Sequence, residues 1–247
     1  MIYRNDEYAD VETATGTMRT HIFRPVAEGE YPAIILYSEI YQVTEPIRRA
    51  AEFLAGHGFI VATPEVYHEF EPLGKVLNYD KPDTDRGNEL KITKEISAFD
   101  SDAKALVEFL KNHPSSSGNI GALGICLGGH LSFRACITEP DIKAGACFYG
   151  TDLHQASLGK GQNDGTLSRC AEIKAEMLMI WGKQDPHIPR EGRRKIYETM
   201  SDADLNFSWH EFNGQHAFMR DVGHRHDPEI ARQVWQLTLD HFTRILK

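Results

Sequence analysis

Short apolar runs alternate along the chain with longer stretches in which apolar residues recur at helical spacing. Tyr31–Tyr37 (YPAIILY) and Gly58–Thr63 (GFIVAT) are continuous apolar runs, which are typical of strands covered on both faces. Residues 94–113 carry apolar side chains at three- and four-residue steps and are followed by Pro114, which predicts an amphipathic helix. The alternating segment Met18–Phe23 (MRTHIF) predicts an antiparallel strand at the edge of a sheet.

The rest of the chain continues this alternation of strands and helices. The further predicted elements are a helix at 47–56, a strand at 119–123, a helix at 127–136, strands at 144–149 and 176–181, a helix at 190–200, a strand at 207–212 and a helix at 228–246. Residues 65–87 and 150–168 are polar and rich in turn residues, so we expect long loops there. Strands separated by helices imply crossover connections and a mostly parallel sheet with helices on both faces. The sequence therefore predicts a single three-layer α/β/α domain over residues 1–247.

Composition and charge narrow the class of protein. The chain has 247 residues, of which 41% are hydrophobic, enough for one sizeable core. Its formal net charge of −9 disfavours nucleic acid or an anionic membrane as a partner, since both need clustered Lys and Arg. A small anionic substrate stays compatible with this charge, because one local arginine can hold a carboxylate. The first residues are polar without an apolar signal segment, and no stretch approaches roughly 18 apolar residues, so we expect a cytoplasmic protein.

The strongest chemical signal is the motif GICLGG at residues 124–129, between a predicted strand and a predicted helix. This is the nucleophile-elbow pattern G-x-nucleophile-x-G, with Cys126 at the nucleophile position. The sharp reversal strains the nucleophile's backbone and requires small residues two positions away on either side. The positive end of the following helix favours a thiolate, and the Leu127 N–H is placed to donate to an oxyanion. The alternative is an inert cysteine in a glycine-rich turn.

Two further residues favour the catalytic interpretation of Cys126. Asp185, in WGKQDP, follows one predicted strand, and His216, in GQHAF, follows the last one. The chain order of nucleophile, acid and histidine is that of the α/β-hydrolases. Because loops at the carboxyl ends of parallel strands converge on one site, the three residues are expected to form a triad. His216 would act as base and acid, with Asp185 holding its tautomer.

No motif predicts a cofactor or a metal ion. The four cysteines form no C-x-x-C pair and lack zinc-site spacing. The glycines at 121–129 lack the dinucleotide spacing G-x-G-x-x-G, and Gly159-Lys160 lacks the earlier glycine of a phosphate loop. His224 and His226 lie in a polar loop that is better explained by solvation than by metal ligation.

Nearly the whole chain resembles the dienelactone hydrolases (carboxymethylenebutenolidases). The resemblance runs from RPVAEGEYPAIILYSEIYQ through GICLGG and WGKQDPHIP to GQHAFMRD. It implies an α/β-hydrolase core of about eight strands that hydrolyses a lactone or related ester through an acyl-thiol intermediate. It also implies that Glu39 holds the resting cysteine and activates it, and that the Ile40 N–H is the second oxyanion donor. By the same resemblance, Arg220 and Arg86 would grip a substrate carboxylate.

Two departures from the family pattern lie around the expected substrate. Gln42 follows Tyr41 where the family often has glycine, and Ala217 follows His216 where the enzymes acting on dienelactone carry a serine. These differences leave the predicted triad intact but favour, as an alternative, a broad carboxylesterase or thioesterase with the same triad. A non-catalytic binding protein on the same scaffold is a third hypothesis, which the intact triad opposes.

Overall fold

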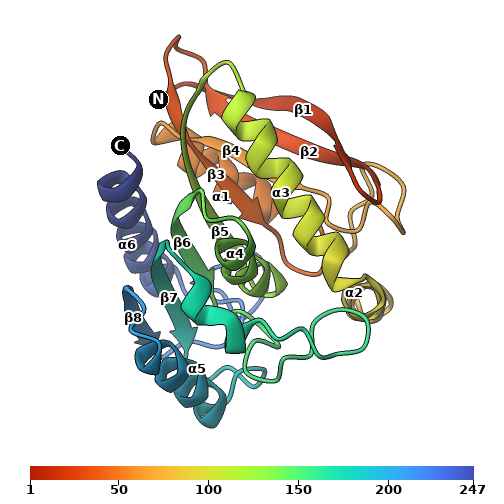
Figure 1. The fold of residues 1–247 in the computed structure, drawn as a ribbon, viewed down its shortest axis with the longest axis vertical. Helices are drawn as coiled ribbons and strands as arrows, with labels where there is room; N and C mark the ends of the chain where they lie inside the picture. Colours follow the sequence, from red (N-terminus) through yellow and green to blue (C-terminus); the bar gives the residue numbers. More distant parts are fainter.

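The computed structural model describes all 247 residues and contains one eight-stranded sheet, in the order β1-β2-β4-β3-β5-β6-β7-β8 (Figure 1). The strands are β1 (Tyr3–Thr13), β2 (Gly16–Pro25), β3 (Tyr31–Tyr37), β4 (Ile60–Pro64), β5 (Ser116–Ile125), β6 (Ile142–Phe148), β7 (Glu176–Gly182) and β8 (Phe207–Phe212). The helices are α1 (Glu45–Gly56), α2 (Lys81–Thr93), α3 (Ile96–Asn112), α4 (Leu127–Thr138), α5 (Arg190–Asp202), α6 (Pro228–Leu246) and the 3₁₀ helix η1 (Leu167–Glu172).

The sheet is parallel from β4 to β8, and only β1 and β2 run antiparallel to their neighbours. Strand β5 lies centrally, paired with β3 on one side and β6 on the other. The carboxyl ends of β3, β5, β7 and β8 therefore open on the same edge of the sheet, where loops from distant parts of the sequence can meet. The predicted fold class, an α/β-hydrolase with about eight strands, is confirmed.

Helices cover the sheet on both faces. Helices α3 and α4 pack against each other in front of the sheet in Figure 1. Helices α1 and α6 are neighbours of each other. The rings of Phe53 from α1 and Trp235 from α6 are in contact, with their centroids 4.8 Å apart. The strands between these layers are almost fully buried, as in Ile34, Val61 and Leu123. None of the helices is both long and apolar enough to cross a membrane.

The prediction of an edge strand at 18–23 is wrong in its placement. These residues belong to β2, which lies between β1 and β4, and the edge is formed by β1. Strand β1 buries only Val11 and is polar on both faces, so it lacks the apolar alternation by which a strand is recognised. Its backbone pairing with β2 holds it in the sheet without a core-facing side chain at every second position.

The prediction of a loop over 65–87 is also only partly correct. Residues 65–80 contain no helix or strand, but α2 begins at Lys81, where the carboxylate of Asp80 accepts a hydrogen bond of 2.9 Å from the Asp83 N–H. Only Gly87 and Leu90 of α2 are buried. The helix therefore has almost no apolar face, and its sequence lacks the periodic pattern from which a helix is predicted. A Cβ on Gly87 would lie 2.6 Å from the Ile40 carbonyl oxygen, so this glycine lets α2 pack directly on the chain that leaves β3.

Candidate active site

Cys126 occupies a strained backbone turn between β5 and α4. Its φ of 61° and ψ of −118° place it outside the regions that residues with a side chain normally adopt. A Cβ on Gly124 would lie 1.7 Å from the Gly128 carbonyl oxygen, and one on Gly128 would lie 2.1 Å from the Tyr37 carbonyl oxygen. The two glycines are therefore needed for the turn to close, as the motif predicts. Cys126 is 8% exposed and lines a cleft.

His216 lies between Asp185 and Cys126. Its Nδ1 is 2.6 Å from Asp185 Oδ2, and the imidazole is within hydrogen-bonding reach of the Cys126 thiol. The second oxygen of Asp185 accepts a hydrogen bond of 2.8 Å from the His187 N–H, so the carboxylate is held at both ends. The structure thus brings the predicted nucleophile, base and acid together from the ends of three strands.

The charges around His216 favour its protonated form. Burial alone would lower the pKa of His216, because a buried imidazolium loses its hydration. The negative charges of a Cys126 thiolate and of Asp185 outweigh burial and raise the pKa to about 10. His216 is therefore favoured as an imidazolium, which can stabilise negative charge on a neighbouring sulfur.

Glu39, Arg220 and Tyr79 are in contact with one another and form a second wall of the cleft. Glu39 is 2% exposed and accepts a hydrogen bond of 3.1 Å from the Tyr79 hydroxyl. Arg220 NH1 lies 3.7 Å from Glu39 Oε1, and the Arg220 guanidinium lies over the Tyr79 ring at 4.3 Å from its centroid. Tyr79 belongs to the segment 65–80, and no local sequence signal marked it, because only the fold places it against Glu39.

Glu39 is a buried carboxyl group in the same cleft as Cys126 and His216. Burial raises its pKa above the ordinary value of a glutamate, although Arg220, His216 and the Tyr79 hydrogen bond oppose the rise. No hydrogen bond joins Glu39 to Cys126, and the hydrogen-bond donor to Glu39 is the Tyr79 hydroxyl. That Glu39 holds and activates the resting cysteine, as the resemblance implies, stays a prediction.

Two backbone N–H groups are free near Cys126. Leu127 is the first residue of α4, so its N–H has no acceptor within the helix. The N–H of Ile40, in the chain that leaves β3, donates to no protein acceptor. Ile40 and Cys126 line the same cleft. These N–H groups match the two donors that the sequence predicts for an oxyanion.

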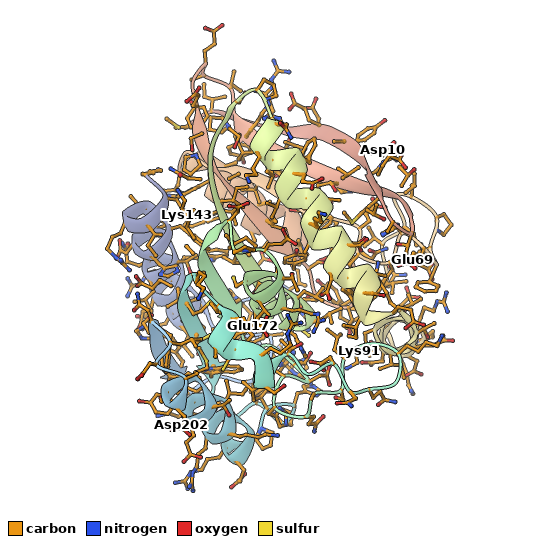
Figure 2. The ribbon with its side chains drawn as sticks, in the orientation of Figure 1. Asp10, Glu69, Lys91, Lys143, Glu172 and Asp202 are labelled. Atoms are coloured by element: carbon orange, nitrogen blue, oxygen red, sulfur yellow. The ribbon has the colours of Figure 1, made fainter.

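The cleft has a volume of about 590 Å³ and a largely polar lining. Helix α2 and the loop after β6 both line the cleft and are joined by an ion pair, in which Lys91 Nζ lies 2.7 Å from Asp152 Oδ2. Lys91 is labelled in Figure 2. Arg225, a residue that the sequence analysis did not identify, lines the cleft without an acidic partner. Helix α2 contributes Thr84, Asn88 and Lys91 to the lining, and the loop after β6 contributes Asp152 and Gln155; His187 comes from the loop after β7, and His224 and Arg225 come from the loop after β8.

Arg86 does not reach the cleft. Its guanidinium binds Glu71 at 2.7 Å and Glu89 at 3.0 Å, and it is absent from the cleft lining. Of the two predicted carboxylate-binding arginines, only Arg220 lies at the site. No group of three or more His, Cys, Asp or Glu side chains is arranged to hold a metal ion.

The fold and the site define an α/β-hydrolase with a cysteine at the nucleophile elbow. The family model for the dienelactone hydrolase family matches residues 18–246, and the chain belongs to this family. It is accordingly a hydrolase of the carboxylic-ester class.

Individual relatives agree with this assignment. The chain is 38% identical to a Saccharomyces cerevisiae protein named "putative carboxymethylenebutenolidase", over 98% of this chain and 92% of that one. It is 25% identical to the carboxymethylenebutenolidase of Pseudomonas putida, over 78% of each chain. The crystal structure of a "putative dienelactone hydrolase" from Klebsiella pneumoniae has the same fold, with a TM-score of 0.84 at 20% identity over 98% of this chain and 99% of that chain.

Proposed function

We propose that the protein hydrolyses a lactone or carboxylic ester through a cysteine acyl-enzyme, with Cys126, His216 and Asp185 as the catalytic triad. The observation that carries this proposal is the position of His216, which is bound to Asp185 on one side and faces the Cys126 thiol on the other. The strained turn at Cys126 supports it, because such strain is retained where it positions a reacting group.

The first half of the reaction forms a thioester. The Cys126 thiolate attacks the carbonyl carbon, and the oxyanion accepts hydrogen bonds from the N–H groups of Leu127 and Ile40. The C–O bond of the ester then breaks, and His216 donates its Nε2 proton to the leaving oxygen. In a lactone this oxygen stays on the same molecule, so ring opening leaves an acyl chain on Cys126 with a free hydroxyl group.

The second half releases the acid. His216, now neutral, accepts a proton from a water molecule as the water oxygen attacks the thioester carbon. The same two N–H groups hold the new oxyanion until the C–S bond breaks. The thiolate and the imidazolium are then restored. Asp185 holds the imidazole in one orientation throughout, because its Oδ2 accepts from Nδ1.

Arg220 supplies the reason to propose an anionic substrate such as a dienelactone. The resemblance implies two arginines that bind a substrate carboxylate, and Arg220 is the one that lines the cleft. Ile40, whose N–H is a proposed oxyanion donor, lines the same cleft. A carboxylate beside the scissile ester could bind its guanidinium through charge-assisted hydrogen bonds. The names of the Saccharomyces cerevisiae and Pseudomonas putida relatives point to the same substrate class.

The test is steady-state hydrolysis of a dienelactone beside a neutral p-nitrophenyl ester, with Cys126→Ala as control. Fast dienelactone turnover that disappears in the variant is the expected result. Turnover that survives in Cys126→Ala would remove the cysteine from the mechanism. Inactivation of the wild-type protein by iodoacetamide, dependent on His216, would separate an enzyme from a binding protein on the same scaffold, because an inert cysteine reacts slowly.

A broad esterase or thioesterase is the second candidate, and one observation favours it. Arg220 is already engaged by Glu39 and Tyr79, and Ala217 has no hydroxyl group to help hold a carboxylate. Faster turnover of the neutral ester than of the dienelactone, unaffected by Arg220→Gln, is the result that this candidate predicts.

A further inference from the structure

A second cavity lies behind the wall that Glu39 and Arg220 form. We call it the side cavity; its volume is about 200 Å³. It lies between α1 and α6, and most of its lining is apolar. The apolar walls comprise Ile47, Ala50 and Phe53 of α1, Ala231 and Trp235 of α6, and Ile125, the residue before Cys126.

Glu39 and Arg220 belong to the linings of both the cleft and the side cavity. They therefore form a partition between a polar space, where the nucleophile lies, and an apolar one. The partition has one unsatisfied group, because the Nε of Arg220 is buried and has no hydrogen-bond acceptor. A buried donor without a partner is costly, so an acceptor brought by a ligand would be strongly favoured there.

The charges around the side cavity are otherwise paired. Arg49 binds both carboxylate oxygens of Asp221, and the Tyr79 hydroxyl donates to Glu39 from the cleft side. His226 adds an imidazole whose Nδ1 lies 3.1 Å from the Phe218 carbonyl oxygen. The guanidinium of Arg220 is thus the cation with unused hydrogen-bonding capacity in this lining.

The size of the side cavity suits one ring. An apolar cavity of about 150 Å³ in another protein stays dry and binds benzene, so a space of about 200 Å³ can hold a monocyclic aromatic group. We propose that the side cavity is a binding site for a small apolar monocarboxylate, whose ring packs against the side chains of Phe53 and Trp235 and whose carboxylate is bound by Arg220.

Such a ligand would act on catalysis through Arg220. If Arg220 also binds the substrate carboxylate, as the proposed function has it, the two carboxylates compete for one guanidinium. The ligand would then inhibit hydrolysis of an anionic lactone competitively and leave hydrolysis of a neutral ester nearly unchanged. This kinetic consequence rests on the proposed function, whereas binding itself does not.

The experiment measures binding of phenylacetate to the full chain by calorimetry, with phenylacetamide as the neutral ligand of the same shape. Binding of phenylacetate should be saturable and at least about tenfold tighter than that of phenylacetamide, because the charge-assisted bond to Arg220 is lost with the amide. Equal affinity of the two compounds, or no binding of phenylacetate, would overturn the proposal.

Filling variants locate the ligand. Ala231→Phe projects a ring into the side cavity and should weaken phenylacetate binding at least about tenfold, and Ala50→Leu fills the same space from α1 if the first variant folds poorly. Asn88→Phe is the matched control, because it narrows the cleft from α2 and should leave binding unchanged. Binding lost in Asn88→Phe but kept in Ala231→Phe would place phenylacetate in the cleft and refute the side-cavity site.

The binding results are independent of the proposed function. If the protein hydrolyses neither the dienelactone nor the neutral ester, the proposed function fails, while phenylacetate binding still decides whether the side cavity is a ligand site.

Discussion

The two walls of the cleft are built in different ways. Cys126 and His216 line one wall, and they and Asp185, which binds His216, all follow the ends of strands and are each at most 8% exposed. The second wall joins Glu39 and Arg220 to Tyr79, which is 38% exposed and belongs to a long segment without helix or strand. The first wall follows strand ends throughout, whereas the second, although Glu39 and Arg220 also come from loops after strands, is completed by Tyr79 from a long excursion of the chain.

This difference separates chemistry from selectivity. The strand-borne wall has paired hydrogen bonds and a strained turn, which suit a group that must be held in one orientation. The wall of Glu39, Tyr79 and Arg220 is held by one hydrogen bond, one long ion pair and one ring contact. We therefore expect changes in the first wall to reduce kcat and changes in the second to alter KM and substrate preference.

Asp185→Asn should have the largest effect. The amide nitrogen would face Nδ1 of His216 and favour the wrong tautomer, and in serine proteases the corresponding change lowers kcat by about 10⁴-fold. We expect a fall of roughly 10³- to 10⁴-fold in kcat with an unchanged circular dichroism spectrum. A variant with more than a tenth of the wild-type kcat would mean that Asp185 does not orient the base.

Arg220→Gln should act on KM. Loss of a charge-assisted hydrogen bond predicts a rise of roughly 10- to 100-fold in KM for the anionic lactone, with little change for a neutral ester. Arg86→Gln is the matched control, because its guanidinium pairs with Glu71 and Glu89 outside the cleft. Equal effects of the two variants, or of Arg220→Gln on both substrates, would contradict the division between the walls.

The protonation of His216 gives a pH-dependent prediction. Its pKa is raised from 6.5 to about 10 in the folded protein, so protonation of His216 stabilises the fold; that contribution is complete below pH 6.5 and is lost as the pH rises through about 10. Because the charge of Cys126 is a main cause, Cys126→Ala should lower this pKa. Nuclear magnetic resonance of the His216 ring should show imidazolium at pH 8 in the wild type and more neutral imidazole in the variant. An identical titration in both would show that Cys126 does not raise the pKa of His216.

Tyr79→Phe should have the smallest effect. The change removes the single hydrogen bond to Glu39 while keeping the ring that lies against Arg220. One such bond contributes enough to change KM for the anionic lactone by about two- to tenfold, with kcat largely kept. A loss of kcat as large as that in Asp185→Asn would show that Tyr79 belongs functionally to the triad wall.

The elements that the sequence predicts well are those with a clear apolar pattern. The parallel strands and the amphipathic helices α1, α3 and α6 lie close to their predicted ranges, because each buries one face or both. Strand β1 and helix α2 were missed for the opposite reason, since one buries Val11 alone and the other only Gly87 and Leu90. Their stability comes from pairing and contacts that no local pattern records.

The sequence by itself determined the class of protein and the identity of the three triad candidates. A nucleophile elbow needs its glycines next to the cysteine in the chain, and the acid and the histidine each follow a strand, so this information is local. Only the tertiary structure decided that Tyr79 meets Glu39, that Arg86 turns away and that a second cavity adjoins Arg220. Tyr79 and Glu39, and the helices α1 and α6 around the cavity, are far apart in the sequence, and the direction of Arg86 depends on how the segment 65–93 folds, so no short motif encodes these contacts.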